Sequence, residues 1–184
     1  MRTRRNELIL LAIIAFLVAW TTLLYYVSPS EIVQAIGVRN AFLIVFLVSA
    51  IGGLSSFTAA SFVLTVTTFA AGGANPYLIG LFAGFGAFLS DSAFFYAGVR
   101  GRKVLEEHWV KLAARIRTFV HAYPAWAVEL LVFGYTGFVP LPNDPLTLSL
   151  ALAKYPYRAI ALPLWAGDTI FILIIALLAH GGLF

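Results

Sequence analysis

The sequence predicts an all-α, polytopic membrane protein with two re-entrant helical hairpins in an inverted repeat and a cytoplasmic amphipathic helix. Three observations predict this fold. Of the 184 residues, 61% are hydrophobic and only 11% are charged, with a mean hydropathy of +0.94. The apolar residues form long uncharged runs, and two of these runs are broken near their centres. A soluble domain carries about 25% charged residues, so the composition excludes an ordinary soluble fold and a disordered chain.

The basic residues indicate membrane orientation rather than a nucleic-acid partner. The net charge is +4, and the twelve Lys and Arg residues stand between the apolar runs, as in membrane proteins. The chain has no cysteine, its three histidines are scattered, and no hydrolase or phosphate-binding motif is present. We therefore expect no enzyme activity, no metal and no cofactor.

Five apolar runs organise the chain. They cover Leu8–Val27, Ala41–Gly73, Tyr77–Val99, Ala125–Ala153 and Ile160–Ala179. The first run is long enough to span a bilayer, which takes about 20 residues, and no small-residue cleavage site follows it. We therefore expect residues 1–40 to hold an N-terminal transmembrane helix and an outer surface segment, and residues 41–184 to form one membrane domain.

The second and fourth runs are too long for one span and too short for two. The second is interrupted by glycines and hydroxyl residues, and the fourth by three prolines, which cannot continue a helix. The breaks contain Ser55, Ser56 and Thr58 in the second run and Pro140, Pro142 and Pro145 in the fourth.

Charge placement favours re-entrant hairpins over single crossings. Arg2, Arg4 and Arg5 place the N-terminus in the cytoplasm. If both broken runs dip into the membrane and return, the basic stretch 100–117 and the basic turn at 154–158 also lie in the cytoplasm. Hairpins that enter from opposite faces, each followed by a full span, are typical of inverted-repeat transporters. The alternative is six plain short helices with ordinary loops.

Two surface helices are also expected. Apolar residues recur at helical spacing over Lys103–Ala122, with basic residues between them, which predicts an amphipathic helix on the inner membrane surface or over the bundle. Ser30–Gly37 is expected to form a short outer helix capped by Ser30.

Four acids lie in or beside the apolar runs and are candidates for a substrate or ion site: Asp91, Glu129, Asp144 and Asp168. A charge at the centre of a span costs about 2.5–3.5 kcal/mol on insertion scales, so such residues usually have a function. Asp168 lies about 12 Å from the inner end of its span. The structural alternative for Asp168 is a hydrogen bond to a neighbouring helix or to an amide of the broken hairpin. For Asp91 it is an ion pair with Arg100 or another basic residue near the inner surface, and for Asn143 or Asp144 it is a helix cap.

Two arginines complete the candidate set. Arg158 lies at the inner interface, where an ordinary anchoring role is favoured and phosphate binding is the functional interpretation. Arg100 ends the third run and is a second candidate for a phosphate contact. Asn143, at the proline-rich break, offers a polar side chain beside Asp144.

Two segments of the chain resemble signatures of the DedA family, also called the VTT or SNARE-associated Golgi protein family. The first is Gly84–Gly101, with Asp91, Tyr96 and Arg100, and the second runs from Phe138 through Pro140 and Asp144 to Arg158 and Gly167. The resemblance covers roughly residues 41–178. It implies a transporter of phospholipids or of undecaprenyl phosphate, with Asp91, Pro140, Asp144 and Arg158 as matching positions.

Three functions are therefore considered. The first is a lipid translocase or scramblase in the cell membrane, with anionic or phosphate headgroups and protons as partners. The second is a proton- or cation-coupled transporter of a small polar solute. The third is a non-transporting assembly factor whose hairpins pack against another membrane protein, and an oligomer is compatible with each function.

Overall fold

The computed structural model describes residues 29–52 and 59–182, and in these ranges every regular element is a helix. The helices are α2 (Pro29–Ile36), α3 (Val38–Gly52), α4 (Ala59–Ala71), α5 (Pro76–Ala122), α6 (Ala125–Phe138), α7 (Asp144–Leu152) and α8 (Tyr157–His180). The predicted helix Leu8–Val27 and the predicted break at Ser55, Ser56 and Thr58 lie outside the described residues.

Within residues 29–52 and 59–182, two helical segments are long and apolar enough to cross a membrane. They are Pro76–Gly101 of α5 and Tyr157–His180, which is α8. A third span results if α2 and α3 are counted together, although the chain bends by 100° between them. Gly37 forms this bend with a φ of 83°, a conformation that glycine adopts without strain. These spans are compatible with a membrane protein.

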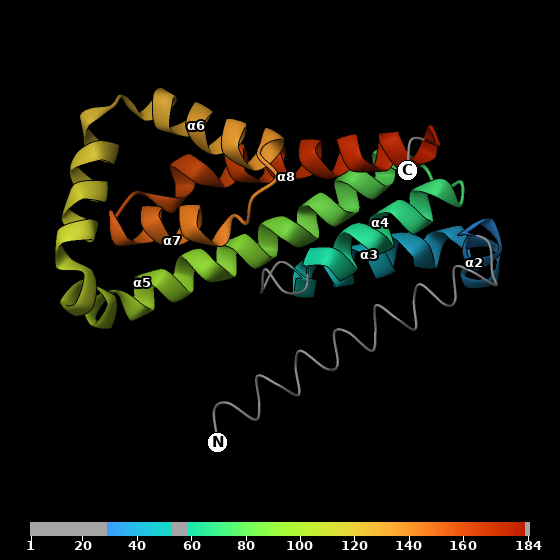
Figure 1. Cartoon of the computed structure of the whole chain (residues 1–184), viewed down its shortest axis with the longest axis horizontal. Coiled ribbons are helices and arrows are strands. Elements are labelled where there is room, and N and C mark those ends of the chain that lie inside the picture. The colour runs from blue at the N-terminus through green and yellow to red at the C-terminus, as the bar shows by residue number, and fades with distance from the viewer. Residues whose placement is uncertain (1–28, 53–58, 183–184) are drawn as a thin grey trace, which may run out of the picture.

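The long helices α5 and α8 pack against each other at the centre of the structure (Figure 1). The shorter helices lie at opposite ends of this pair, with α3 and α4 at one end and α6 and α7 at the other. At the first end, α3 packs on α5 and α4 packs on α8. At the second end, α6 packs on α8 and α7 packs on α5. The two ends share one pattern. The first short helix of each pair (α3 or α6) contacts the next long helix in the chain, and the second short helix (α4 or α7) contacts the other long helix.

Glycines allow the central helices to approach closely. A Cβ at Gly84 of α5 would lie 2.6 Å from the Cα of Thr169 on α8. On the opposite side of α8, a Cβ at Gly167 would lie 3.0 Å from the carbonyl oxygen of Phe133 on α6. Small residues at such contacts are typical of helix packing within membranes.

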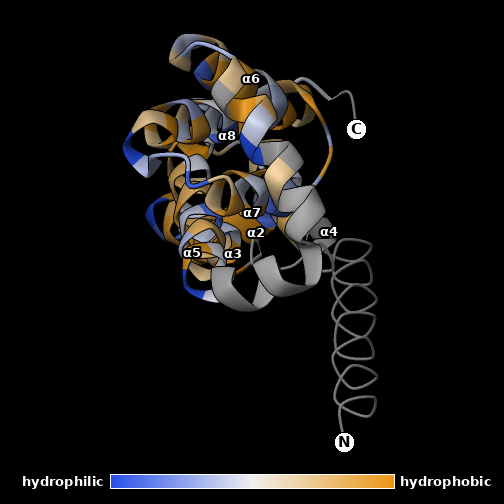
Figure 2. Ribbon diagram, turned by 90° about the vertical axis from the view of Figure 1, so that its left-hand side faces the viewer, coloured by the Kyte–Doolittle hydropathy of each residue, from blue (hydrophilic) through white to orange (hydrophobic). Residues whose placement is uncertain are grey.

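Buried side chains form two apolar clusters, one at each end of the α5–α8 pair. The first includes Val45, Phe69, Ile79 and Ile172, and the second includes Phe95, Val132, Leu150, Ile160 and Leu164. Many large hydrophobic side chains are exposed, among them Leu43, Leu130 and Leu162. Coloured by hydropathy, the ribbon is hydrophobic over much of the described chain (Figure 2). Exposed apolar surface of this extent suits contact with lipid.

The stretch Lys103–Ala122 is helical as predicted, but it is continuous with the preceding span, because one helix, α5, runs from Pro76 to Ala122. No proline or left-handed glycine stands near Arg100 to end the helix. Its 47 residues correspond to about 70 Å, more than twice the thickness of a bilayer core. Figure 1 shows that α5 changes direction before it reaches α6. The short helix predicted over Ser30–Gly37 is present as α2, but it begins at Pro29, so Ser30 lies within the helix.

Candidate functional site

The break between α6 and α7 positions the candidate site. Helix α6 ends at Phe138, and α7 begins at Asp144 with Pro145 in its first turn. The hydroxyl group of Tyr135, in the last turn of α6, donates a 3.0 Å hydrogen bond to the carbonyl oxygen of Pro142. This bond ties the non-helical segment to α6, so the three prolines interrupt the helix as the sequence predicts.

Asn143, the last residue of this break, joins the two long helices. Its side-chain Nδ2 donates hydrogen bonds to Asp91 Oδ2 on α5, at 2.8 Å, and to Asp168 Oδ1 on α8, at 2.9 Å. An amide nitrogen carries two hydrogens, so one nitrogen can serve both carboxyl groups. One side chain from the break therefore connects an acid on each long helix.

Both carboxyl groups are almost completely buried, with exposed fractions of 4% for Asp91 and 3% for Asp168. Within the described part of the chain, neither forms an ion pair with a basic residue. The second oxygen of Asp168, Oδ2, is buried without a hydrogen-bond partner, as are Ser90 Oγ and Thr169 Oγ1 on the neighbouring positions of the two helices. The polar cluster therefore contains hydrogen-bonding groups that could bind a proton or a small ligand.

The position of the cluster along the helices is also informative. Asp168 is in the middle of α8, between Leu164 of one apolar cluster and Ile172 of the other. On α5, Asp91 is placed in the same way between Ala83 and Phe95. The two acids and Asn143 thus form a polar layer between two apolar layers.

The helix-cap alternative for Asn143 does not fit its side chain. Asn143 occupies the capping position of α7 but makes no side-chain bond to the helix, because its amide is bonded to the two aspartates. Asp91 accepts from Asn143 and forms no ion pair with Arg100, which is exposed. Of the basic residues named for Asp91, Arg100 is therefore not its partner.

The other candidates lie outside the polar cluster. Asp144 begins α7 directly after Asn143. Glu129 and Arg158 line a separate groove between α6 and α8. Pro140 and Pro142 are exposed within the break. The structure thus brings together three of the predicted residues, Asp91, Asn143 and Asp168.

One polar contact beside the cluster was not expected from the sequence. The Ser92 hydroxyl on α5 is hydrogen-bonded to the Tyr157 hydroxyl at the start of α8. Ser92 donates its single hydrogen to the carbonyl oxygen of Phe88, so Tyr157 is the donor in this pair. The Tyr157 ring packs against Phe95 and Tyr96, at centroid distances of 5.2 and 5.0 Å. Two residues 65 positions apart give no local sequence signal for such a contact.

Two buried carboxyl groups that share one amide donor form an environment in which binding of one proton is favoured over two negative charges. In the described part of the chain, no group of three or more His, Cys, Asp or Glu side chains is arranged to hold a metal ion. Comparisons with models of protein families, with curated proteins and with solved structures gave no match.

Proposed function

We propose that the protein is a membrane lipid translocase that moves phospholipid or polyprenyl phosphate across the bilayer, coupled to protons bound at the Asp91–Asn143–Asp168 cluster. The observation that carries this proposal is the bridge formed by Asn143. A side chain at the break of a short helix pair bonds to one acid on each of two potential spans. A movement of the break would therefore alter the surroundings of both acids.

The lengths of the short helices support re-entrant hairpins. Helix α6 has 14 residues and α7 has 9, about 21 and 14 Å. Neither reaches across a hydrocarbon core of about 30 Å. A broken helix at membrane depth is tolerated where its free backbone groups meet protein or a water-filled cavity. The pair α6–α7 is thus suited to enter the membrane and return on the same side.

The packing pattern supports an inverted repeat. In each half, a pair of short helices precedes a long helix, and the members of the pair contact different long helices. The two halves lie at opposite ends of the α5–α8 pair (Figure 1). Inverted repeats with broken helices and a polar site near the midplane are typical of secondary transporters.

The composition of the cluster supports proton coupling. Two buried carboxylates with one neutral partner place two negative charges in a low-dielectric layer, which is unfavourable. Binding of one proton removes one of these charges, and its release restores it. A conformational change that separates the break from the two aspartates would expose them to water and let the proton leave.

The resemblance to the DedA family supports a lipid as the substrate. The matching positions Asp91 and Asp144 lie at or beside the polar cluster, and Arg158 lies at the start of α8. The basic residues at 2–5, 100–117 and 154–158 support a location in the cell membrane with the N-terminus and these stretches in the cytoplasm.

Reconstitution into liposomes tests the proposal. Lipids with a fluorescent acyl chain, one a phospholipid and one a polyprenyl phosphate, are followed by the accessibility of the label to a membrane-impermeant quencher. The proposal predicts that at least one lipid moves between leaflets faster than in protein-free vesicles. Rates equal to those of protein-free vesicles for both lipids would contradict it.

The second candidate is a cation-coupled transporter of a small polar solute, which the unpartnered Asp168 Oδ2 favours as a cation ligand. Vesicles with an imposed pH or sodium gradient and a mixture of labelled solutes distinguish the two candidates. Solute accumulation without lipid movement would favour this second function.

A further inference from the structure

A groove between α6 and α8 has the features of a lipid-binding site distinct from the polar cluster. Its volume is about 510 Å³. The side chains that line it are Trp126, Glu129, Leu130, Phe133, Arg158, Ala159, Leu162, Pro163 and Ala166. Helices α6 and α8 pack side by side and run in the same direction, so both begin at the same end of the groove (Figure 1).

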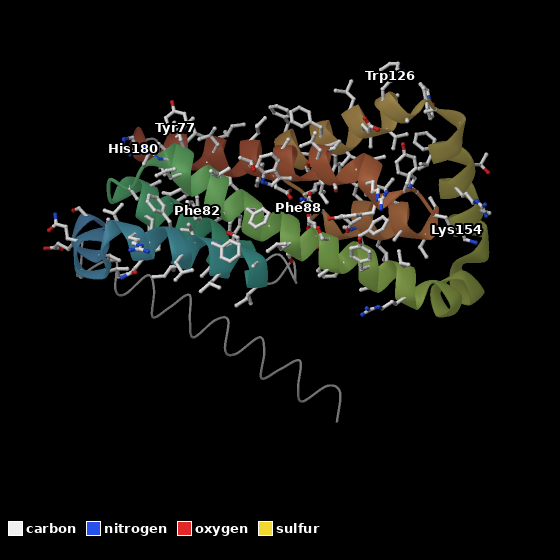
Figure 3. The ribbon with its side chains drawn as sticks, turned by 180° about the vertical axis from the view of Figure 1, so that it is seen from behind. Tyr77, Phe82, Phe88, Trp126, Lys154 and His180 are labelled. Atoms are coloured by element: carbon white, nitrogen blue, oxygen red, sulfur yellow. The ribbon has the colours of Figure 1, made fainter. Side chains whose placement is uncertain are left out.

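The polar groups of the groove are confined to that end. Glu129 is in the second turn of α6 and Arg158 is the second residue of α8. Further along, the lining is apolar, with Leu162 and Ala166 one and two turns after Arg158. The side-chain view shows Trp126 and Lys154 toward this end of the molecule, opposite Tyr77 and His180 (Figure 3). Tryptophan and basic residues are common at the membrane interface, where headgroups lie.

Arg158 and Glu129 offer charges of opposite sign to a ligand in the groove. Arg158 is exposed and Glu129 is partly buried. Within the described ranges, neither side chain forms a hydrogen bond or an ion pair. A ligand that carries one anionic and one cationic group can therefore satisfy both without displacing a partner.

We propose that this groove binds a zwitterionic phospholipid whose headgroup carries a primary ammonium. Arg158 binds the phosphate, because a guanidinium fork matches phosphate oxygens. Glu129 accepts hydrogen bonds from the ammonium, and the acyl chains lie along Leu130, Leu162 and Ala166. This assignment rests on the proposed function, because it requires the groove between α6 and α8 to face the lipid bilayer.

Other occupants match the groove less well. A polyprenyl phosphate offers a phosphate to Arg158 but no cation to Glu129, whose negative charge repels it. A choline headgroup has a positive charge but no N–H to donate. A small polar solute gains nothing from the apolar part of the lining. The pairing of Glu129 with Arg158 therefore selects an ethanolamine-type headgroup.

Native mass spectrometry of the full chain in detergent tests this assignment. The protein is titrated with phosphatidylethanolamine, phosphatidylcholine, phosphatidylglycerol and a polyprenyl phosphate of matched total concentration. We expect retention of phosphatidylethanolamine about fivefold above phosphatidylglycerol, the ratio that corresponds to about 1 kcal/mol from an exposed charge pair. Equal retention of the four lipids would overturn the proposal.

Charge-neutral variants identify the groups responsible. Glu129→Gln should remove the preference for phosphatidylethanolamine, and Arg158→Gln should weaken retention of all four lipids. Arg117→Gln, an exposed arginine outside the groove, serves as the control and should leave retention unchanged. A preference that persists in Glu129→Gln would contradict the assignment. Helical content measured by circular dichroism confirms that each variant is folded.

The binding readout separates this inference from the proposed function. A preference without lipid movement in liposomes would contradict translocation and leave the binding site standing. Lipid movement without a preference that depends on Glu129 would contradict the binding site and leave translocation standing.

Discussion

Asn143 Nδ2 lies 2.8 Å from Asp91 Oδ2, although 52 positions separate the two residues in the chain. The same nitrogen lies 2.9 Å from Asp168 Oδ1. Because one nitrogen serves both acids, the break between α6 and α7 cannot move without changing a hydrogen bond to α5, to α8 or to both. This geometry makes Asn143 the most informative position for substitution.

Asn143→Leu should destabilise the protein and reduce translocation. Leucine has a similar volume but no donor, so two buried carboxyl groups lose their partner. The expected cost is about 1–3 kcal/mol of unfolding free energy. Thermal unfolding in detergent, followed by circular dichroism, measures the change. Asn40→Leu is a matched control, because Asn40 is exposed and its side chain donates to the backbone carbonyl of Ile36 on the preceding helix. Equal effects of the two substitutions would show that the bridge contributes nothing specific.

Gly84→Ala should destabilise the contact between α5 and α8. The new Cβ would lie 2.6 Å from the Cα of Thr169, so the two helices must separate. Overpacking of this kind costs about 1–3 kcal/mol. Gly134→Ala in α6 is the control, since no atom lies within 4 Å of its added Cβ. Helix propensity then predicts that Gly134→Ala is neutral or stabilising by up to about 1 kcal/mol. Thermal unfolding of both variants measures the difference, and an unaffected Gly84→Ala would contradict the close contact.

Tyr157→Phe should lower stability by about 1 kcal/mol, because it removes the hydrogen bond to Ser92 and keeps the ring. Ser92 retains its bond to the Phe88 carbonyl, so no donor is left unpaired. Tyr96→Phe is the control, since Tyr96 contacts the same ring through its own ring and is half exposed. Denaturant titration should show a lower midpoint for Tyr157→Phe than for Tyr96→Phe. The reverse order would contradict the Ser92–Tyr157 bond.

The absence of cysteine makes membrane orientation directly measurable. Tyr77→Cys and Lys154→Cys place single thiols at exposed positions toward opposite ends of the structure (Figure 3). A membrane-impermeant maleimide applied to intact cells should label Tyr77→Cys, and Lys154→Cys should react only after the membrane is opened. Labelling of both positions in intact cells would contradict the orientation given by the positive residues.

The sequence predicted those helices and breaks that depend on neighbouring residues in the chain. Three prolines between Pro140 and Pro145 interrupt any helix, and the structure breaks there. The long apolar runs likewise predicted α8 and the first part of α5, because each run is long enough to cross a membrane as a helix. The continuation of α5 beyond Arg100 was missed because a change from apolar to charged composition does not by itself end a helix. Backbone hydrogen bonds persist until a proline or a cap interrupts them.

The candidate site was predictable in its members but not in its contacts. Asp91 and Asp168 could be selected from the sequence, because a charged side chain in an apolar run costs free energy on insertion into the membrane and therefore usually has a function. A hydrogen bond between Asp168 and an amide of the broken hairpin was among the alternatives, and Asn143 supplies it. That the same nitrogen also serves Asp91 was not predicted, because Asn143 occupies a capping position and a local bond to α7 was the simpler expectation. Only the packing of α7 on α5 and of α6 on α8 brings Asn143 to both acids. The Ser92–Tyr157 bond depends on the same packing and has no local signal.

The response of lipid movement to a pH gradient in Asp168→Asn tests the central claim most directly. Asparagine keeps the size of the side chain and an oxygen for Asn143, and it cannot bind or release a proton. In liposomes with an imposed pH gradient, the wild-type protein should move labelled lipid faster than without the gradient. Asp168→Asn should move lipid at one rate under both conditions. An acceleration by the gradient equal to that of the wild type would contradict proton coupling at the Asp91–Asn143–Asp168 cluster.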